Sequence, residues 1–239
     1  MKKLLSVLVF SLLVAGPLLA QESAQGTQGG GESTSESNRG GAHAAINYSP
    51  VGVHIPTLVA PPVGLAFFLG NSWMLGGEYG ASRFTYTTTD KDKYNLTYSN
   101  TGLNVRWFPF NSFNMLGAMH QRNFTAAGPI KFNDPSGNKY TAEFTAKANA
   151  TVGSLGLSNH WLTDWHFFIG FDWGVYSLLM AHSEEVTITN IRDQNGNTVP
   201  VPSSATSFAA TEAAKTSLLG INMLSALPGF LIFTVGVYF

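Results

Sequence analysis

The sequence contains no cysteine and few charged residues. Without cysteine, the chain has no disulfide scaffold, no thiolate metal site and no thiol nucleophile, and it is not a bacterial lipoprotein, whose lipid is attached to cysteine. Charged residues make up 11% of the chain, against roughly 25% in soluble proteins, which disfavours an ordinary soluble enzyme. The 13 bases and 14 acids give no excess of positive charge, so we expect no nucleic-acid partner.

Long apolar runs are confined to the start of the chain. Met1–Lys3 is cationic, Leu4–Val14 is apolar apart from its serines, and Ala20 is a small residue before polar Gln21. This pattern predicts a secretory signal peptide over residues 1–20, whose removal leaves more acids than bases. No later run approaches about 18 apolar residues, so no transmembrane helix is predicted. Residues 21–44, rich in Gly, Ser and Gln, are predicted to be a disordered linker.

Residues 45–239 show a period of two, which is typical of β-strands. In Tyr140–Val152, apolar and small residues alternate with Thr, Glu, Lys and Asn, and Trp165–Leu179 alternates in the same way. Such runs exceed the usual soluble strand of about five or six residues and match a tilted membrane strand with an extension. Tryptophans cluster near the expected turns, as an interfacial girdle requires: Trp73, Trp107, Trp161 and Trp165.

The last ten residues, Phe230–Phe239, carry the most specific pattern. One face of this strand carries Leu231, Phe233, Val235, Val237 and Phe239. The chain here resembles the small bacterial outer-membrane β-barrel proteins, the class of the OmpA membrane domain, OmpX and OmpW. The resemblance implies that these five residues form an assembly signal read by the barrel-assembly machinery, after passage through the Sec translocon. It also implies location in the cell outer membrane of a Gram-negative bacterium, in contact with outer-membrane lipid and lipopolysaccharide.

Eight segments fit the alternation and predict an all-β fold, an eight-stranded antiparallel up-and-down transmembrane β-barrel. The segments are Asn47–Ile55, Val63–Leu69, Trp73–Thr87, Tyr94–Phe108, Asn114–Thr125, Tyr140–Leu157, Trp165–Met180 and Gly229–Phe239. Short periplasmic turns are expected at Gly70–Ser72, Pro109–Phe113 and Ser158–Asp164. Longer outer loops are expected at Thr88–Lys93, Ala126–Lys139 and Ala181–Pro228.

The segment Ser207–Leu227 fits two structures. As a strand it places Leu219, Ile221 and Met223 on one face; as a helix it begins at Ser207 and stops at Pro228. The barrel needs an even number of strands, and the other eight satisfy that. The sequence therefore favours a short helix in the last outer loop, with the strand as the alternative.

The interior of such a barrel is only wide enough to be filled by side chains, so its charges must be paired. The predicted lumen plug consists of Glu78, Arg106, Arg122, Glu143, Lys147 and Asp172. We expect Lys147 to pair with Asp172, Glu143 with Arg122, and Glu78 with Arg106. The alternative is a gated ion path lined by these residues.

No catalytic, cofactor or metal site is predicted. The six histidines show no metal-ligand spacing. His182-Ser183-Glu184-Glu185 offers residue types used by outer-membrane lipid-modifying enzymes, but neighbours on a strand point to opposite faces, which opposes a triad. The predicted function is a non-enzymatic outer-membrane barrel with a structural, surface-display or ligand-contact role. The alternatives are a narrow channel for small or apolar solutes, as in the OmpW class, and a lipid-modifying enzyme.

Overall fold

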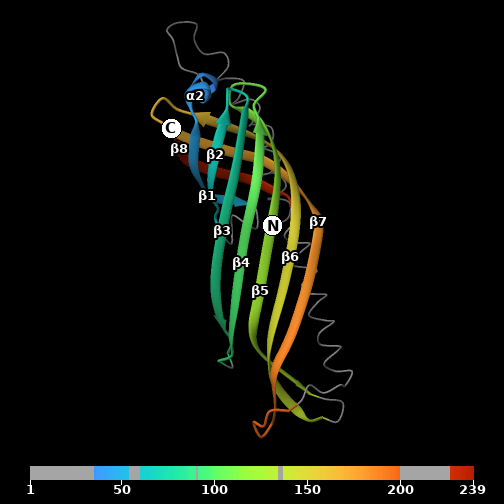
Figure 1. Ribbon diagram of the computed structural model, residues 1–239. Coiled ribbons are helices and arrows are strands. Elements are labelled where there is room, and N and C mark those ends of the chain that lie inside the picture. Colours follow the sequence, from blue (N-terminus) through green and yellow to red (C-terminus); the bar gives the residue numbers. More distant parts are fainter. Residues whose placement is uncertain (1–34, 54–59, 90, 134–136, 200–226) are drawn as a thin grey trace, which may run out of the picture. The chain divides into compact units, whose positions relative to one another are not determined.

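The computed structural model describes residues 35–53, 60–89, 91–133, 137–199 and 227–239 (Figure 1). The described elements are one short helix and eight strands: α2 (Ser35–Gly41), β1 (Ala44–Val53), β2 (Val63–Leu69), β3 (Trp73–Thr87), β4 (Lys93–Trp107), β5 (Phe113–Asn133), β6 (Lys139–Leu162), β7 (Phe167–Asp193) and β8 (Gly229–Tyr238). The expected signal peptide and the helix-or-strand segment at 207–226 lie outside the described residues. Among the residues described, no helix has the length and apolarity needed to span a membrane.

The strands form a closed ring, which confirms the predicted all-β, eight-stranded antiparallel barrel. Each strand pairs with the next, and β8 closes the ring on β1, with Ala45 opposite Tyr238 and Tyr48 opposite Val235. The turns that join β2 to β3, β4 to β5 and β6 to β7 lie at one end together with the C-terminus. We call this the short-turn end; β3 and β5 end, and β4 and β6 begin, at the opposite end.

The strands differ greatly in length. β1, β2 and β8 have 10, 7 and 10 residues, whereas β5, β6 and β7 have 21, 24 and 27. The long strands continue past the short ones as an extension of the sheet, towards the bottom of Figure 1. Ala126–Asn133 and Ala181–Asp193 were predicted to be loop but are strand. The expected turn at Ser158–Asp164 was also wrong, because β6 pairs with both neighbours almost to its end and turns only after Leu162.

An apolar belt surrounds the barrel on its outward face. Its exposed side chains include Leu65, Phe67, Leu75, Leu103, Met119, Leu155 and Leu178. At the short-turn end the belt is bordered by Trp73 and Trp107, whose ring centroids are 6.3 Å apart. At the other end the outward row consists of Thr101, Gln121 and Thr151, which are opposite one another in the ladders. The belt therefore has an aromatic border and a polar border.

Beyond the belt the polarity of the two faces is inverted. Within the belt, β6 turns Leu155 and Leu157 outward and buries Ser154 and Ser158. In the extension the same strand buries small apolar side chains, Ala142, Ala146, Ala148 and Ala150. Its outward side chains there are polar: Thr141, Glu143, Thr145, Lys147, Asn149 and Thr151. The inward placement predicted for Glu143 and Lys147 was therefore wrong, because the inner face of the extension is an apolar cluster and the polar side chains lie on the outer face.

Three bulges along β7 shift its faces, and one of them lies opposite Thr141–Glu143 of β6. Leu157 lies opposite Gly174 but Ser158 lies opposite Asp172, so Trp173 is an extra residue in the ladder. A second shift leaves Met180 extra between Leu179 and Ala181. Each extra residue moves the inward face by one position. Asp172 and Val175 consequently both point into the barrel.

The linker expected to be disordered contains structure at its end. Ser35–Gly41 form helix α2, and β1 begins at Ala44, at the end of the predicted linker. The helix forms because its side chains and backbone find partners on the barrel turns, which composition alone does not reveal. Ser35 and Arg39 are buried despite their polarity.

Candidate functional site

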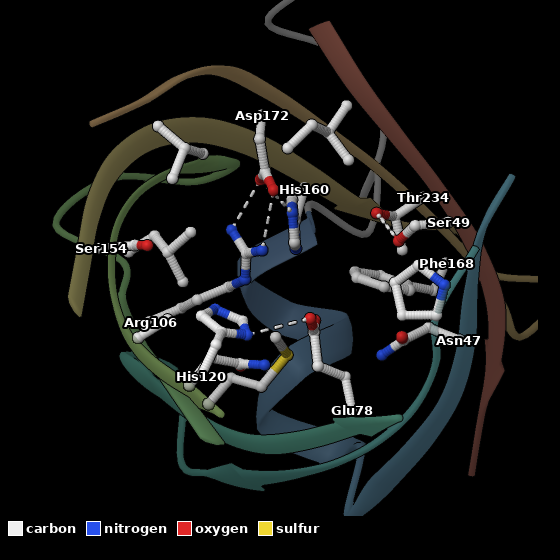
Figure 2. Close-up of a pocket in the computed structure, with 17 residues that line it drawn as sticks. Asn47, Ser49, Glu78, Arg106, His120, Ser154, His160, Phe168, Asp172 and Thr234 are labelled. Atoms are coloured by element: carbon white, nitrogen blue, oxygen red, sulfur yellow. Dashed lines mark hydrogen bonds and ion pairs between the residues drawn. The ribbon is translucent and has the colours of Figure 1, made fainter. Parts of the chain in front are cut away.

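A buried ion pair occupies the centre of the lumen. Arg106 of β4 and Asp172 of β7 point towards each other from opposite walls (Figure 2). Arg106 Nη1 donates to Asp172 Oδ1 at 2.8 Å, and Nη2 donates to Oδ2 at 3.1 Å. This bidentate geometry matches the guanidinium fork to the carboxylate and is among the strongest side-chain hydrogen-bonding arrangements.

Further polar side chains contact Arg106 and Asp172. Arg106 Nη1 also lies 3.1 Å from Asn114 Oδ1 and 2.8 Å from Ser158 Oγ, so β5 and β6 contribute acceptors. His160 Nε2 lies 3.3 Å from Asp172 Oδ1. The ring of His160 fills the space beside Gly170, where a Cβ atom would stand 2.7 Å from Nε2. A buried ion pair stabilises only when its remaining donors and acceptors are satisfied, and these neighbours meet that condition.

A second polar cluster lies beside the first. Glu78 Oε1 accepts a hydrogen bond from Asn100 Nδ2 at 3.1 Å and lies 3.3 Å from His120 Nδ1. His120 approaches Glu78 at ion-pair distance without the alignment of a hydrogen bond. Arg122 is buried on the same inward face of β5 as His120. The described interior thus holds Glu78 and Asp172 against Arg106 and Arg122, which balances its formal charge.

The space left between these clusters is small. A cavity of about 60 Å³ is lined by side chains of both clusters and by Asn104, Ser49 and Thr234. At roughly 30 Å³ for each water molecule, it has room for about two. The hydroxyl oxygens of Ser49 and Thr234 are 2.8 Å apart and join β1 to β8 along one wall (Figure 2). The described side chains therefore fill most of the lumen at this level and leave only this small cavity between the two clusters.

An apolar layer follows towards the short-turn end. Its buried side chains include Phe68, Met74, Phe108, Leu162, Phe168 and Tyr238. The ring of Phe168 packs edge-on against His160, with centroids 4.9 Å apart, so the apolar layer contacts the polar network directly. Charged solutes crossing this layer would lose their hydration without gaining partners.

Helix α2 lies beyond the apolar layer and contacts all three short turns. Arg39 Nε donates to the carbonyl oxygen of Asn71 at 2.8 Å, and its Nη1 donates to the carbonyl oxygen of Asn111. The guanidinium carbon lies 4.1 Å from the centre of the Phe108 ring. Asn38 Nδ2 donates to the carbonyl oxygen of Leu162 at 2.8 Å. Burial lowers the pKa of Arg39 to about 10, and the nearby Glu36 carboxylate acts in the opposite direction by raising it.

Of the six residues of the predicted plug, four lie inside the barrel and two lie on its outer surface. Glu78, Arg106, Arg122 and Asp172 lie inside the barrel. Lys147 lies on the outer surface, where its Nζ is 3.1 Å from Glu185 Oε2. Glu143 is also outside, and its Oε2 accepts from Asn190 Nδ2 at 2.7 Å.

The expected pairings differ from those in the structure: Asp172 pairs with Arg106 rather than with Lys147. Glu78 contacts Asn100 and His120, and Glu143 lies on the outer face. The expectation considered neighbouring strands, whereas a narrow barrel lets residues pair across its interior. The prediction also missed Asn114, Ser158, His160 and Arg39. Asn114 and Ser158 share the inward face of their strands, a signal that the sequence contained.

Other candidate residues are placed as follows. His182 Nδ1 and Glu184 Oε1 are 2.9 Å apart, while Ser183 accepts a hydrogen bond from Asn149, which lies opposite it on β6. Within the described residues, no group of three or more His, Asp or Glu is arranged to hold a metal ion. On β8, Ile232, Thr234 and Tyr238 are buried, so the face that carries Leu231, Phe233, Val235 and Val237 points outward.

The fold and the site define a closed eight-stranded β-barrel with a filled interior and a helical cap. No family model and no curated protein matches the sequence. Among solved structures, CarO2 of Acinetobacter baumannii is similar, with a TM-score of 0.40 and 11% identity over 83% of this chain and 98% of that chain. CarO of the same organism gives the same TM-score and identity over 83% of this chain and 96% of its own. The strand pairing of this chain defines the fold by itself.

Proposed function

We propose that the protein is an integral outer-membrane β-barrel with a closed lumen, whose role is structural and surface-displaying rather than enzymatic. One observation carries this proposal: the barrel exposes an apolar belt and encloses its charges. Leu103 is 65% exposed and Leu155 is 69% exposed, whereas Arg106 and Asp172 are 7% and 5% exposed. A soluble barrel shows the reverse distribution, because water favours apolar side chains inside.

The dimensions of the belt also support membrane insertion. On β7, outward apolar side chains run from Phe167 through Ile169, Tyr176 and Leu178 to Met180. A tilted strand needs about 9–11 residues to cross the hydrocarbon core, so this stretch is long enough. The short turns and the C-terminus share one end, as in outer-membrane barrels, where that end faces the periplasm.

The non-enzymatic part of the proposal rests on the absence of a suitable constellation in the described chain. Ser183 and His182 bond to different partners and point to opposite faces of β7. The lumen groups are engaged with each other, and the cavity beside them is too small for a lipid.

Delivery through the Sec translocon and folding by the barrel-assembly machinery remain part of the proposal.

The experiment that tests this function is fractionation of expressing cells, followed by gel migration with and without heating. We expect the mature protein in the outer-membrane fraction, with migration that shifts on heating, because a closed barrel has no edge from which to unfold in detergent. The soluble protein fraction of the same cells is the control. Recovery from the periplasm without detergent would contradict the proposal.

A further inference from the structure

The extension of the sheet carries a pocket on its outward face, which we call the rim pocket. Its long side chains come from the hairpin between β3 and β4 and from β6: Lys91, Asp92, Lys93, Asn95, Glu143 and Thr145. The floor is made by small residues of β5, among them Ala127 and Pro129. The pocket has a volume of about 550 Å³ and is open to the outside. This size fits a sugar unit or two.

The hairpin holds two lysines at the edge of this pocket. Lys91 adopts a φ of 63°, and its N–H donates to the carbonyl oxygen of Thr88 at 3.0 Å. The N–H of Thr88 donates in turn to the carbonyl oxygen of Asp92 at 2.9 Å. This compact turn keeps Lys91 and Lys93 on the pocket although their side chains are exposed.

The acids of the rim pocket already have donors. Asp92 Oδ2 lies 2.8 Å from Lys131 Nζ, and Glu143 Oε2 accepts from Asn190 at 2.7 Å. Neither Lys91 nor Lys93 forms an ion pair within the part of the chain that the structure describes. Two ammonium groups are thus available, beside the amide of Asn95 and the hydroxyls of Thr145 and Thr189. Ammonium groups among amides and hydroxyls suit an anionic, hydroxyl-rich ligand.

The height of the pocket narrows the choice of ligand. Its floor residue Ala127 lies six residues beyond Gln121, where the apolar belt ends, which is about 20 Å along the strand at roughly 3.3 Å per residue. If the barrel is inserted as proposed above, this position lies outside the outer leaflet. The material that surrounds a barrel at this level is the sugar core of lipopolysaccharide, which carries phosphates and acidic sugars.

We infer that the rim pocket binds a phosphorylated or acidic core sugar of lipopolysaccharide. Lys91 and Lys93 contact the anionic group, and Asn95, Thr145 and Thr189 bond to sugar hydroxyls. This inference rests on the proposed outer-membrane placement. It adds a defined lipopolysaccharide site to that placement, on the outer face and away from the lumen.

The test measures binding of purified, core-phosphorylated lipopolysaccharide to the folded full-length mature protein in detergent at low salt. The variant is Lys91→Gln with Lys93→Gln, and the control is Lys139→Gln, an exposed lysine on the next hairpin that does not line the pocket. We expect the double variant to bind about tenfold more weakly, from two surface ion pairs lost together. We expect Lys139→Gln to stay within about twofold of the original protein.

A second probe is the same lipopolysaccharide after enzymatic removal of its phosphates. If the pocket recognises phosphate, the affinity of the original protein for this probe should fall towards that of the double variant. If the pocket recognises the acidic sugar, the affinity should stay above that of the double variant. Equal affinities of the original and double-variant proteins would overturn the inference, as would an equal loss in Lys139→Gln. Heat-shifted migration of each sample reports the fold independently. Unchanged binding by a double variant that fractionates correctly and shifts on heating would therefore refute the rim pocket and leave the barrel proposal intact.

Discussion

Arg106 and Asp172 join opposite walls of the barrel through two hydrogen bonds of 2.8 and 3.1 Å. Their strands, β4 and β7, are separated in the ring by β5 and β6. The pair is therefore a cross-brace through the interior. It also closes the lumen at the level of the small cavity, because each partner occupies the space that a solute would need.

Removal of one partner should destabilise the barrel strongly. We expect Arg106→Met or Asp172→Asn alone to cost about 3–5 kcal/mol of unfolding free energy, because each leaves an uncompensated buried group. The double variant should cost less than the two losses added, because the partners interact directly. Urea unfolding in lipid vesicles measures all three values.

The control for this cycle is Lys147→Met combined with Asp172→Asn. Lys147 lies on the outer surface with its side chain 46% exposed, paired to Glu185. We expect Lys147→Met alone to cost at most about 1 kcal/mol and to add to the Asp172→Asn loss. A coupling as large as that of the true pair would place Lys147 in the lumen and contradict the structure.

The sequence predicted the strand number and the faces of the terminal strand because both follow from local alternation. The period of two likewise predicts that Leu103 and Val105 point outward and that Arg106 points inward. The partner of Arg106 was not readable, since pairing across a lumen depends on barrel width and tilt. The bulge at Trp173 was also hidden, because one extra residue shifts a face without leaving a signal in composition.

The error at Glu143 and Lys147 has a separate physical cause. The rule that polar residues face inward holds only within the apolar belt. Ala146 and Ala148 are buried and Lys147 is exposed because β6 has already left the belt at this height. The missing information was the position at which the strand leaves the apolar belt.

Helix α2 should protect the peptide bond after Arg39 from trypsin. Cleavage requires the helix to leave the short turns, so its rate reports the opening of the cap. Asn38→Ala removes two hydrogen bonds, to the Leu162 carbonyl and the Asp164 carboxylate, and should speed cleavage about tenfold or more. Mass spectrometry of timed digests measures this rate.

Glu36→Gln is the matched control for the cap, because the Glu36 side chain is exposed. We expect its cleavage rate to stay within about twofold of the original. Rapid cleavage after Arg39 in the unaltered folded protein would show that α2 does not cap the barrel.

The apolar belt predicts a depth-dependent cost for charge. Leu103→Arg places a cation in the belt and should destabilise the protein by about 2–4 kcal/mol in vesicles. Thr97→Arg, on the same outward face of β4 but beyond the belt, should change stability by less than about 0.5 kcal/mol. Equal effects of the two substitutions in urea unfolding would show that no membrane boundary separates them.

Deletion of Phe239 should reduce assembled barrel far more than it reduces export. Its carbonyl oxygen accepts hydrogen bonds from the backbone N–H groups of His43 and Ala44, at 2.8 and 3.0 Å, and its side chain ends the outward face of β8. The amount of heat-shifting protein in the outer membrane measures assembly. Phe110→Ala, at an exposed short-turn aromatic, should leave this amount unchanged. Normal barrel levels without Phe239 would remove the terminal strand as an assembly signal.

The most direct test of a membrane-inserted barrel with a closed lumen is ion conductance across a planar bilayer that contains the purified, heat-shifting protein. The cross-brace, the apolar layer and α2 together predict no stepwise conductance above the protein-free bilayer, even as the amount of inserted protein rises. Stable, repeated conductance steps from the unaltered protein would contradict the closed lumen and would favour the narrow channel instead.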